Sequence, residues 1–161
     1  MGVFFSGGEL VDIAVGIERN GASFYDSLAK SASNEIAKDI YEHLANEEKK
    51  HIGVFQSMLA AVADYRLPEA YTEEYDLYLK SLVNSAVFSD NQIAREMAQK
   101  IGSDAEAIQI ALGAEKDSIL FYSNLRDLVR RSDRQVIDRI IEEEKSHLRQ
   151  LSDLKKSLSK W

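Results

Sequence analysis

Two glutamate–histidine pairs with the same spacing stand out in the sequence. Glu48 is followed three positions later by His51, and Glu144 is followed three positions later by His147. Residues three apart lie on the same face of an α-helix, so each pair can present a carboxylate and an imidazole to one point. Carboxylate oxygens together with imidazole nitrogens are ligands that suit iron or manganese. The two pairs therefore predict metal binding.

A lone glutamate precedes each pair at nearly the same distance. Glu18 and Glu115 are both followed six positions later by the dipeptide Phe-Tyr. The chain thus carries two copies of the pattern Glu…Glu-x-x-His, which indicates an internal repeat. A single Glu-x-x-His is a weak signal, whereas a doubled one with matched upstream glutamates is specific. The predicted metal ligands are Glu18, Glu48, His51, Glu115, Glu144 and His147.

Four long helices must position these residues. Apolar residues recur at a three-to-four spacing over about residues 9–30, 34–65, 104–130 and 133–159, and the ligands interrupt the middle of each apolar stripe. A carboxylate in such a stripe is costly unless it is paired or binds a metal. Two helix pairs with matching inward polar residues predict an all-α four-helix bundle, which we expect to be a single domain over residues 1–161.

A long connection separates the two helix pairs. Residues 66–102 are predicted to hold two short helices, at about residues 72–83 and 90–101, and a crossover of this length lets the second and third long helices run parallel. The residues expected to pack the first short helix are Tyr71, Tyr75, Tyr78, Leu79 and Leu82. Capping boxes of the form Ser-x-x-Glu or Ser-x-x-Gln predict helix starts at Ser89, Ser103 and Ser132.

The balance of charge favours two metal ions. Four carboxylates in one core would raise one another's pKa and destabilise the fold, whereas two divalent cations neutralise them. Hard oxygen ligands with imidazole suit Fe²⁺ or Mn²⁺. The alternative is a bundle that binds no metal and uses buried acid–histidine pairs to fix its register. The sequence leaves open which glutamates bridge the ions.

Four further residues are placed where they could support the ligands. Tyr25 and Tyr122 lie two helical turns beyond the lone glutamates and could each donate a hydrogen bond to a ligand carboxylate, although aromatic residues are also ordinary in a core. Glu47 and Glu143 directly precede ligand glutamates. Each could accept a hydrogen bond from the histidine of the other pair, as metal-bound histidines usually require. A solvated helix face is the alternative for both.

The composition excludes several other classes of protein. The chain of 161 residues contains no cysteine, which excludes disulfides, thiolate catalysis, cysteine-ligated zinc and iron–sulfur centres within it. Its net charge of −7 argues against a nucleic-acid partner. No apolar run approaches the ~20 residues that cross a bilayer, and the N-terminus lacks the basic region of a secretory signal. We therefore expect a cytoplasmic protein with neither a nucleic-acid nor a membrane partner.

The doubled ligand pattern resembles that of the rubrerythrin-type di-iron proteins in the ferritin-like superfamily, and the resemblance covers both helix pairs. It implies a ferritin-like bundle that holds two iron ions, with manganese as the alternative metal and no catalytic group beyond the ligands. It also implies reduction of hydrogen peroxide or O₂ with electrons from an external donor, such as a rubredoxin-like protein, and assembly as a homodimer.

The sequence departs from this family at three points. Rubrerythrins commonly carry a further glutamate where Ser118 stands, and their usual rubredoxin domain needs cysteines that this chain lacks. Lys49 stands where bacterioferritins have a haem-binding methionine, so we expect no haem. Three alternatives stay open: an iron-binding or storage protein with ferroxidase activity, a manganese catalase, and a structural bundle without metal.

Overall fold

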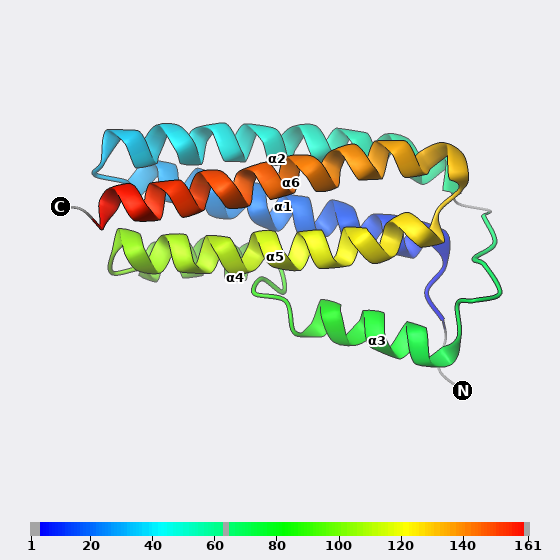
Figure 1. Cartoon of the computed structure of the whole chain (residues 1–161). Helices are drawn as coiled ribbons and strands as arrows, with labels where there is room; N and C mark the ends of the chain where they lie inside the picture. Colours follow the sequence, from blue (N-terminus) through cyan, green and yellow to red (C-terminus); the bar gives the residue numbers. More distant parts are fainter. Residues whose placement is uncertain (1–3, 63–64, 160–161) are drawn as a thin grey trace.

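The chain folds almost entirely into α-helices (Figure 1). The structure is a computed structural model that describes residues 4–62 and 65–159. Within these residues the helices are α1 (Gly7–Ser31), α2 (Glu35–Val62), α3 (Glu73–Asn84), α4 (Asn91–Lys100), α5 (Asp104–Leu128) and α6 (Arg131–Leu158). In this part of the chain no helix has both the length and the apolar character needed to cross a bilayer.

The four long helices lie side by side as a bundle, which confirms the predicted fold class (Figure 1). α1 and α6 run in one direction, and α2 and α5 run in the other. Short turns therefore join α1 to α2 and α5 to α6 as antiparallel pairs. α2 and α5 are parallel because the crossover returns the chain to the end of the bundle where α2 began.

The crossover consists of α3 and α4, which lie outside the four-helix core (Figure 1). α3 packs on α5, and α4 packs along α1. α4 begins after Asp90, whose carboxylate accepts a hydrogen bond from the backbone N–H of Ile93 at 2.8 Å, so the predicted capping box at Ser89 is wrong. Tyr78 is 43% exposed, and its predicted packing role is also wrong because it lies on the outer face of α3.

The starts of α5 and α6 differ from each other in their capping. The hydroxyl of Ser103 accepts a hydrogen bond from the backbone N–H of Glu106, as predicted, but the Glu106 carboxylate binds the N–H of Gly102 instead of closing the box. α6 begins at Arg131, and its N-cap Arg130 makes no side-chain capping bond. The predicted box at Ser132 is therefore wrong, because an Arg130–Asp133 ion pair of 2.9 Å closes this turn instead.

The end of the second long helix also differs from its predicted position. α2 ends at Val62 rather than near residue 65. Residues 63–64 lie outside the described residues, and Tyr65 is not helical. The backbone N–H of Tyr65 donates a hydrogen bond to the carbonyl of Val62 at 3.0 Å.

The core is divided into two apolar clusters along the bundle axis. The four long helices each contribute to both clusters, and the stretch of each helix between its two contributions carries the predicted ligands. One cluster includes Val11, Phe55, Leu125 and Ile137. The other includes Leu28, Leu44, Ile108 and Leu151. Packing from both ends therefore holds a polar layer in the middle of the bundle.

Asp76 in α3 ties the crossover to the N-terminal segment. Its side chain is buried and accepts hydrogen bonds from the backbone N–H of Phe5 at 2.8 Å and from the hydroxyl of Tyr71 at 2.5 Å. Its other oxygen lies 2.5 Å from the ammonium of Lys80. Burial alone would raise the pKa of Asp76, but Lys80, Tyr71 and the Phe5 N–H outweigh it and lower that pKa. The carboxylate thus stays ionised and holds three separate segments together.

Replacement of this carboxylate tests its role. We expect Asp76→Asn to lower the free energy of unfolding by about 2 kcal/mol, because hydrogen bonds to a charged group contribute about 1.5–3 kcal/mol. Urea denaturation measures the change. Glu74→Gln is the matched control: Glu74 is an exposed acid on the same helix, so we expect a change within about 0.5 kcal/mol. Equal effects of the two substitutions would contradict the account.

Candidate metal centre

The structure brings the six predicted ligands together in the polar layer between the two apolar clusters. α1 contributes Glu18, and α5 contributes Glu115. Each of the other two long helices contributes a glutamate and a histidine one turn apart. None of these six residues is more than 3% exposed: Glu18, Glu48, His51, Glu115, Glu144 and His147.

The ligand atoms form two overlapping groups. Glu18 and His51 belong to one group, and Glu115 and His147 belong to the other. Glu48 and Glu144 belong to both. Within each group, one oxygen or nitrogen from every residue lies within 4.8 Å of the others, which is close enough to surround one ion. Two adjacent ions would therefore share the carboxylates of Glu48 and Glu144, a choice that the sequence had left open.

Several buried polar atoms at the centre lack a hydrogen-bond partner among the described residues. They include one oxygen each of Glu18, Glu48 and Glu115 and both carboxylate oxygens of Glu144. The Nδ1 atoms of both histidines are in the same condition. A buried polar atom without a partner costs about 1–3 kcal/mol, so a concentration of them needs an explanation. Hard oxygens and imidazole nitrogens turned toward one another fit divalent iron or manganese.

The surroundings of three ligand carboxylates, those of Glu18, Glu48 and Glu115, favour their neutral forms when no metal is bound. Burial raises the pKa of Glu18 well above its usual range, and the charge of Glu144 raises it further. Burial and the charges of Glu18 and Glu115 do the same for Glu48. Burial and the charge of Glu144 raise the pKa of Glu115 to about 8. Metal cations bound at these oxygens in place of protons would offset the free-energy cost of burying the ionised carboxylates.

The two histidines face the carboxylates with Nδ1. Nδ1 of His51 lies 2.8 Å from an oxygen of Glu144, and Nδ1 of His147 lies 3.3 Å from an oxygen of Glu48. Burial lowers the pKa of His51, but the nearby carboxylates outweigh it and raise that pKa to about 9. The carboxylates outweigh burial at His147 as well and raise its pKa. Both rings are thus turned to offer Nδ1 to a shared interior point, and they stack with centroids 5.9 Å apart.

Two tyrosines cross-connect the halves of the bundle. Tyr25 of α1 donates a hydrogen bond to Glu115 of α5 at 2.6 Å, and Tyr122 of α5 donates one to Glu18 of α1 at 2.7 Å. Each tyrosine therefore binds the lone glutamate of the opposite half. Burial and the nearby carboxylates raise the pKa of both hydroxyls well above the usual range, so both remain donors. These bonds fix the carboxylates through their second oxygen.

The glutamates that precede the ligand pairs behave differently from each other. Glu143 lies 2.6 Å from Nε2 of His51, so this N–H binds a carboxylate while Nδ1 points inward. Glu47, its counterpart, accepts a hydrogen bond from Lys50 at 2.8 Å, and one of its oxygens lies within 4.8 Å of a His51 nitrogen. No hydrogen bond from His147 to Glu47 is found among the described residues, whereas the expected bond between His51 and Glu143 is present.

Gly21 also shapes the candidate metal centre, although the spacing of the ligands in the sequence does not identify it. A Cβ atom at this position would lie 3.5 Å from the carboxylate of Glu48. The α1 backbone therefore comes close to the shared carboxylate without covering it with a side chain. The only signal in the sequence is a glycine within the inner stripe of a long helix, which costs about 0.5–1 kcal/mol relative to alanine.

A four-helix bundle with two overlapping carboxylate–histidine groups in its core defines a ferritin-like dimetal-carboxylate protein. Comparison with known families agrees: the model of the rubrerythrin family matches residues 9–155, and the chain belongs to that family. A solved structure from Thermotoga maritima, described as a ferritin-like diiron-carboxylate protein, is similar over 97% of this chain and 98% of its own. The identity is 26% and the TM-score 0.71. No curated protein matches the sequence.

The hydrogen bond from Tyr25 allows a test of the site with a matched control. Tyr25→Phe removes the donor to Glu115, and we expect it to weaken metal binding about 10- to 100-fold, as loss of a group that orients a ligand typically does. Competition of Mn²⁺ or Fe²⁺ with a chelator measures the affinity. Tyr41→Phe is the control, because the buried hydroxyl of Tyr41 has no hydrogen-bond partner among the described residues and its ring stacks on Tyr25. Equal losses in both variants would show that packing, and not the hydrogen bond, matters.

Proposed function

We propose that this protein binds two iron ions and is a non-haem oxidoreductase that reduces hydrogen peroxide or O₂ with electrons from an external donor. The observation that carries the proposal is the pair of overlapping ligand groups that share Glu48 and Glu144. Membership of the rubrerythrin family and similarity to a protein described as a diiron-carboxylate protein support iron as the metal. The same ligands also suit manganese.

In this proposal the protein's own residues hold and orient the metals. One group consists of Glu18 and His51 and the other of Glu115 and His147, with the two remaining glutamates between them. When bound, a pair of ferrous ions supplies the two electrons that convert one hydrogen peroxide and two protons into two waters, and the donor returns them. Tyr25 and Tyr122 keep the lone glutamates in position. The apolar clusters cover the layer at both of its ends along the bundle.

Several further features belong to the proposal. Lys49, next to a ligand glutamate, forms an ion pair of 2.9 Å with Asp26 on the outer face, so it offers no axial ligand to a haem. The electron donor would be a separate protein of the rubredoxin-like kind, since the chain contains no cysteine. A reducing compartment such as the cytoplasm suits this chemistry. We further propose a homodimer, on the family resemblance alone.

Metal content and oxidation kinetics test the proposal together. Purified protein loaded anaerobically with Fe²⁺ should hold about two iron ions per chain by mass spectrometry, as two adjacent ligand groups require. The double variant Glu48→Ala with Glu144→Ala should lose both, because each ion depends on the shared carboxylates. In stopped-flow experiments, peroxide should oxidise the loaded protein faster than O₂ does.

The control variant carries its substitutions on the same two helices, α2 and α6. Glu42→Ala with Glu142→Ala removes two exposed glutamates from α2 and α6 and should leave metal content unchanged. Uptake of many iron ions per chain by a large assembly would indicate storage instead. Failure of the wild type to bind metal, with melting unaffected by a chelator, would reduce the site to a structural role.

A further inference from the structure

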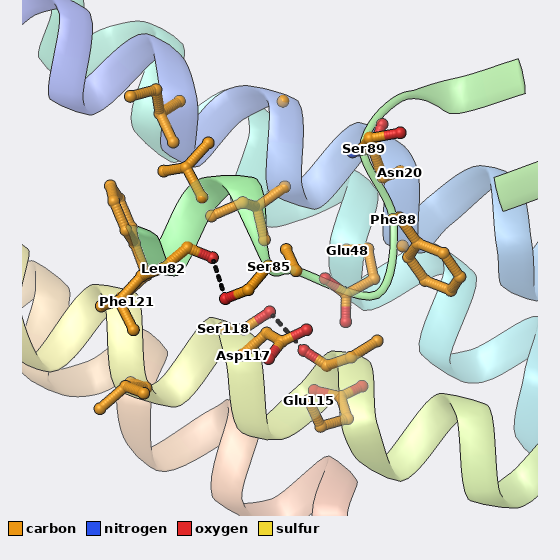
Figure 2. A pocket seen from close by; sticks show the side chains of 18 of the residues that line it. Asn20, Glu48, Leu82, Ser85, Phe88, Ser89, Glu115, Asp117, Ser118 and Phe121 are labelled. Atoms are coloured by element: carbon orange, nitrogen blue, oxygen red, sulfur yellow. Dashed lines mark hydrogen bonds between the residues drawn. The ribbon is translucent and has the colours of Figure 1, made fainter. Parts of the chain in front are cut away.

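A cavity of about 310 Å³ lies beside the metal centre (Figure 2). α1 and α5 form its walls, and the C-terminal end of α3 with the segment that follows it runs between these two helices and lines the cavity. Glu48 and Glu115 lie at its inner end, together with Tyr25. The cavity therefore joins the face of the molecule under the crossover to one ligand from each half of the bundle.

Small residues on both helices create this space. A Cβ atom at Gly16 would meet nothing within 4 Å, so the helix leaves the cavity open at that point. Gly21 leaves the carboxylate of Glu48 uncovered, as described above. On α5, Ala114 and Ser118 line the opposite wall, and the Ser118 hydroxyl is turned back to the carbonyl of Ala114 at 3.1 Å. Neither helix places a large side chain between the cavity and the ligands.

The lining is mostly apolar. Large aliphatic and aromatic side chains surround the cavity: Ile13, Ile17, Leu82, Val83, Phe88 and Phe121. Exposed residues mark its outer limit, among them Ser85 and Ser89. A concave, largely apolar cavity with a few polar groups at one end is the usual form of a small-molecule site, and such sites measure about 300–1,000 Å³.

The cover is fixed to the bundle. The backbone N–H of Val87 donates a hydrogen bond to the carboxylate of Asp117 on α5 at 2.9 Å. The ring of Phe88 packs against Phe24 of α1, with centroids 4.7 Å apart. The segment between α3 and α4 is thus attached to both walls, so the cavity is formed before anything binds in it.

We propose that this cavity binds a small, mostly apolar organic molecule, with its polar end toward the carboxylates of Glu48 and Glu115. Peroxide and O₂ have only two heavy atoms and need no apolar space of this size. A long apolar molecule gains free energy from every methylene group that it buries against the lining. Binding itself is independent of the metals, whereas the placement of the bound molecule beside two ions rests on the proposed function.

A series of linear alcohols from 1-butanol to 1-decanol probes the cavity. With wild-type protein, ligand-observed NMR titrations should show affinity rising about fourfold for each added CH₂ group until the cavity is full, and then levelling off. Gly16→Leu should weaken binding of the longer alcohols at least tenfold. A Cβ atom at position 16 meets nothing within 4 Å, so the leucine side chain would fill part of the cavity that the alcohols occupy. The titrations are made on iron-loaded and on metal-free protein.

Gly53→Leu is the matched control. Gly53 is also a glycine inside a long helix whose Cβ would meet nothing within 4 Å, but it is exposed on α2 and does not line the cavity. Its alcohol binding should equal that of the wild type. Circular dichroism and melting verify that both variants fold, and Gly16→Ala, which should weaken binding of the longest accommodated alcohol about fourfold, replaces the leucine variant if that one unfolds.

The outcomes separate this proposal from the preceding one. Absence of saturable binding in the wild type, affinity independent of chain length, or unchanged binding in the Gly16 variants would overturn the assignment of the cavity. Alcohol binding as expected in a protein that takes up no iron would support the cavity and contradict only the proposed redox function.

Discussion

The free energy of burying four carboxylates and two imidazoles in one layer is the constraint on which the rest of the structure depends. Isolated charges cannot remain in an apolar core, so they must be neutralised by protons or by cations. Glu48 and Glu144 lie in both ligand groups, so each of them faces carboxylates of both groups. Two divalent ions between the groups would offset the repulsion between these carboxylates and would couple metal binding to the stability of the fold.

The geometry of the bundle serves this layer. Every long helix contributes to the apolar clusters on both sides of the ligand layer. The packing of these clusters therefore fixes the position of the ligands along each of the four helices. The bonds of Tyr25 and Tyr122 run between opposite halves, and this exchange locks α1 to α5 at the level of the ligands. The two helix pairs are thus connected at the level of the ligands, where the positions of the carboxylates matter most for neutralising their charge.

The internal symmetry is broken in ways that matter for function. Glu143 binds His51, whereas Glu47 pairs with Lys50, so the outer nitrogens of the two histidines have different surroundings. The crossover packs on α1 and α5, and the cavity lies there (Figure 2). The surroundings of the metal centre are therefore asymmetric, although its ligand set is nearly two-fold symmetric.

The sequence predicts the bundle and the ligand layer well because both depend on helical periodicity. Glu18 and Glu115 interrupt apolar stripes, and their doubled context sets them apart from the many other acids. The cavity could not be predicted in this way. It depends on where the segment around Val87 crosses the bundle and on the tertiary surroundings of Gly16, which no local pattern contains.

The capping interactions at helix starts are predicted less well than the starts themselves, for a related reason. Capping boxes were expected at Ser89 and Ser132, but Asp90 and the Arg130–Asp133 ion pair offer competing ways to close the same turns. The burial of Asp76 was equally hidden, since its three partners come from different parts of the crossover and the N-terminal segment. Tertiary contacts determine which capping interaction forms and which acid is buried, and the local sequence of a turn does not contain this information.

The most direct measurement is anomalous diffraction from crystals loaded with Mn²⁺ or, anaerobically, with Fe²⁺. The account predicts two peaks in the polar layer, with Glu48 and Glu144 each contacting both ions and with one histidine at each. A single ion, or two ions that share neither of these glutamates, would contradict it.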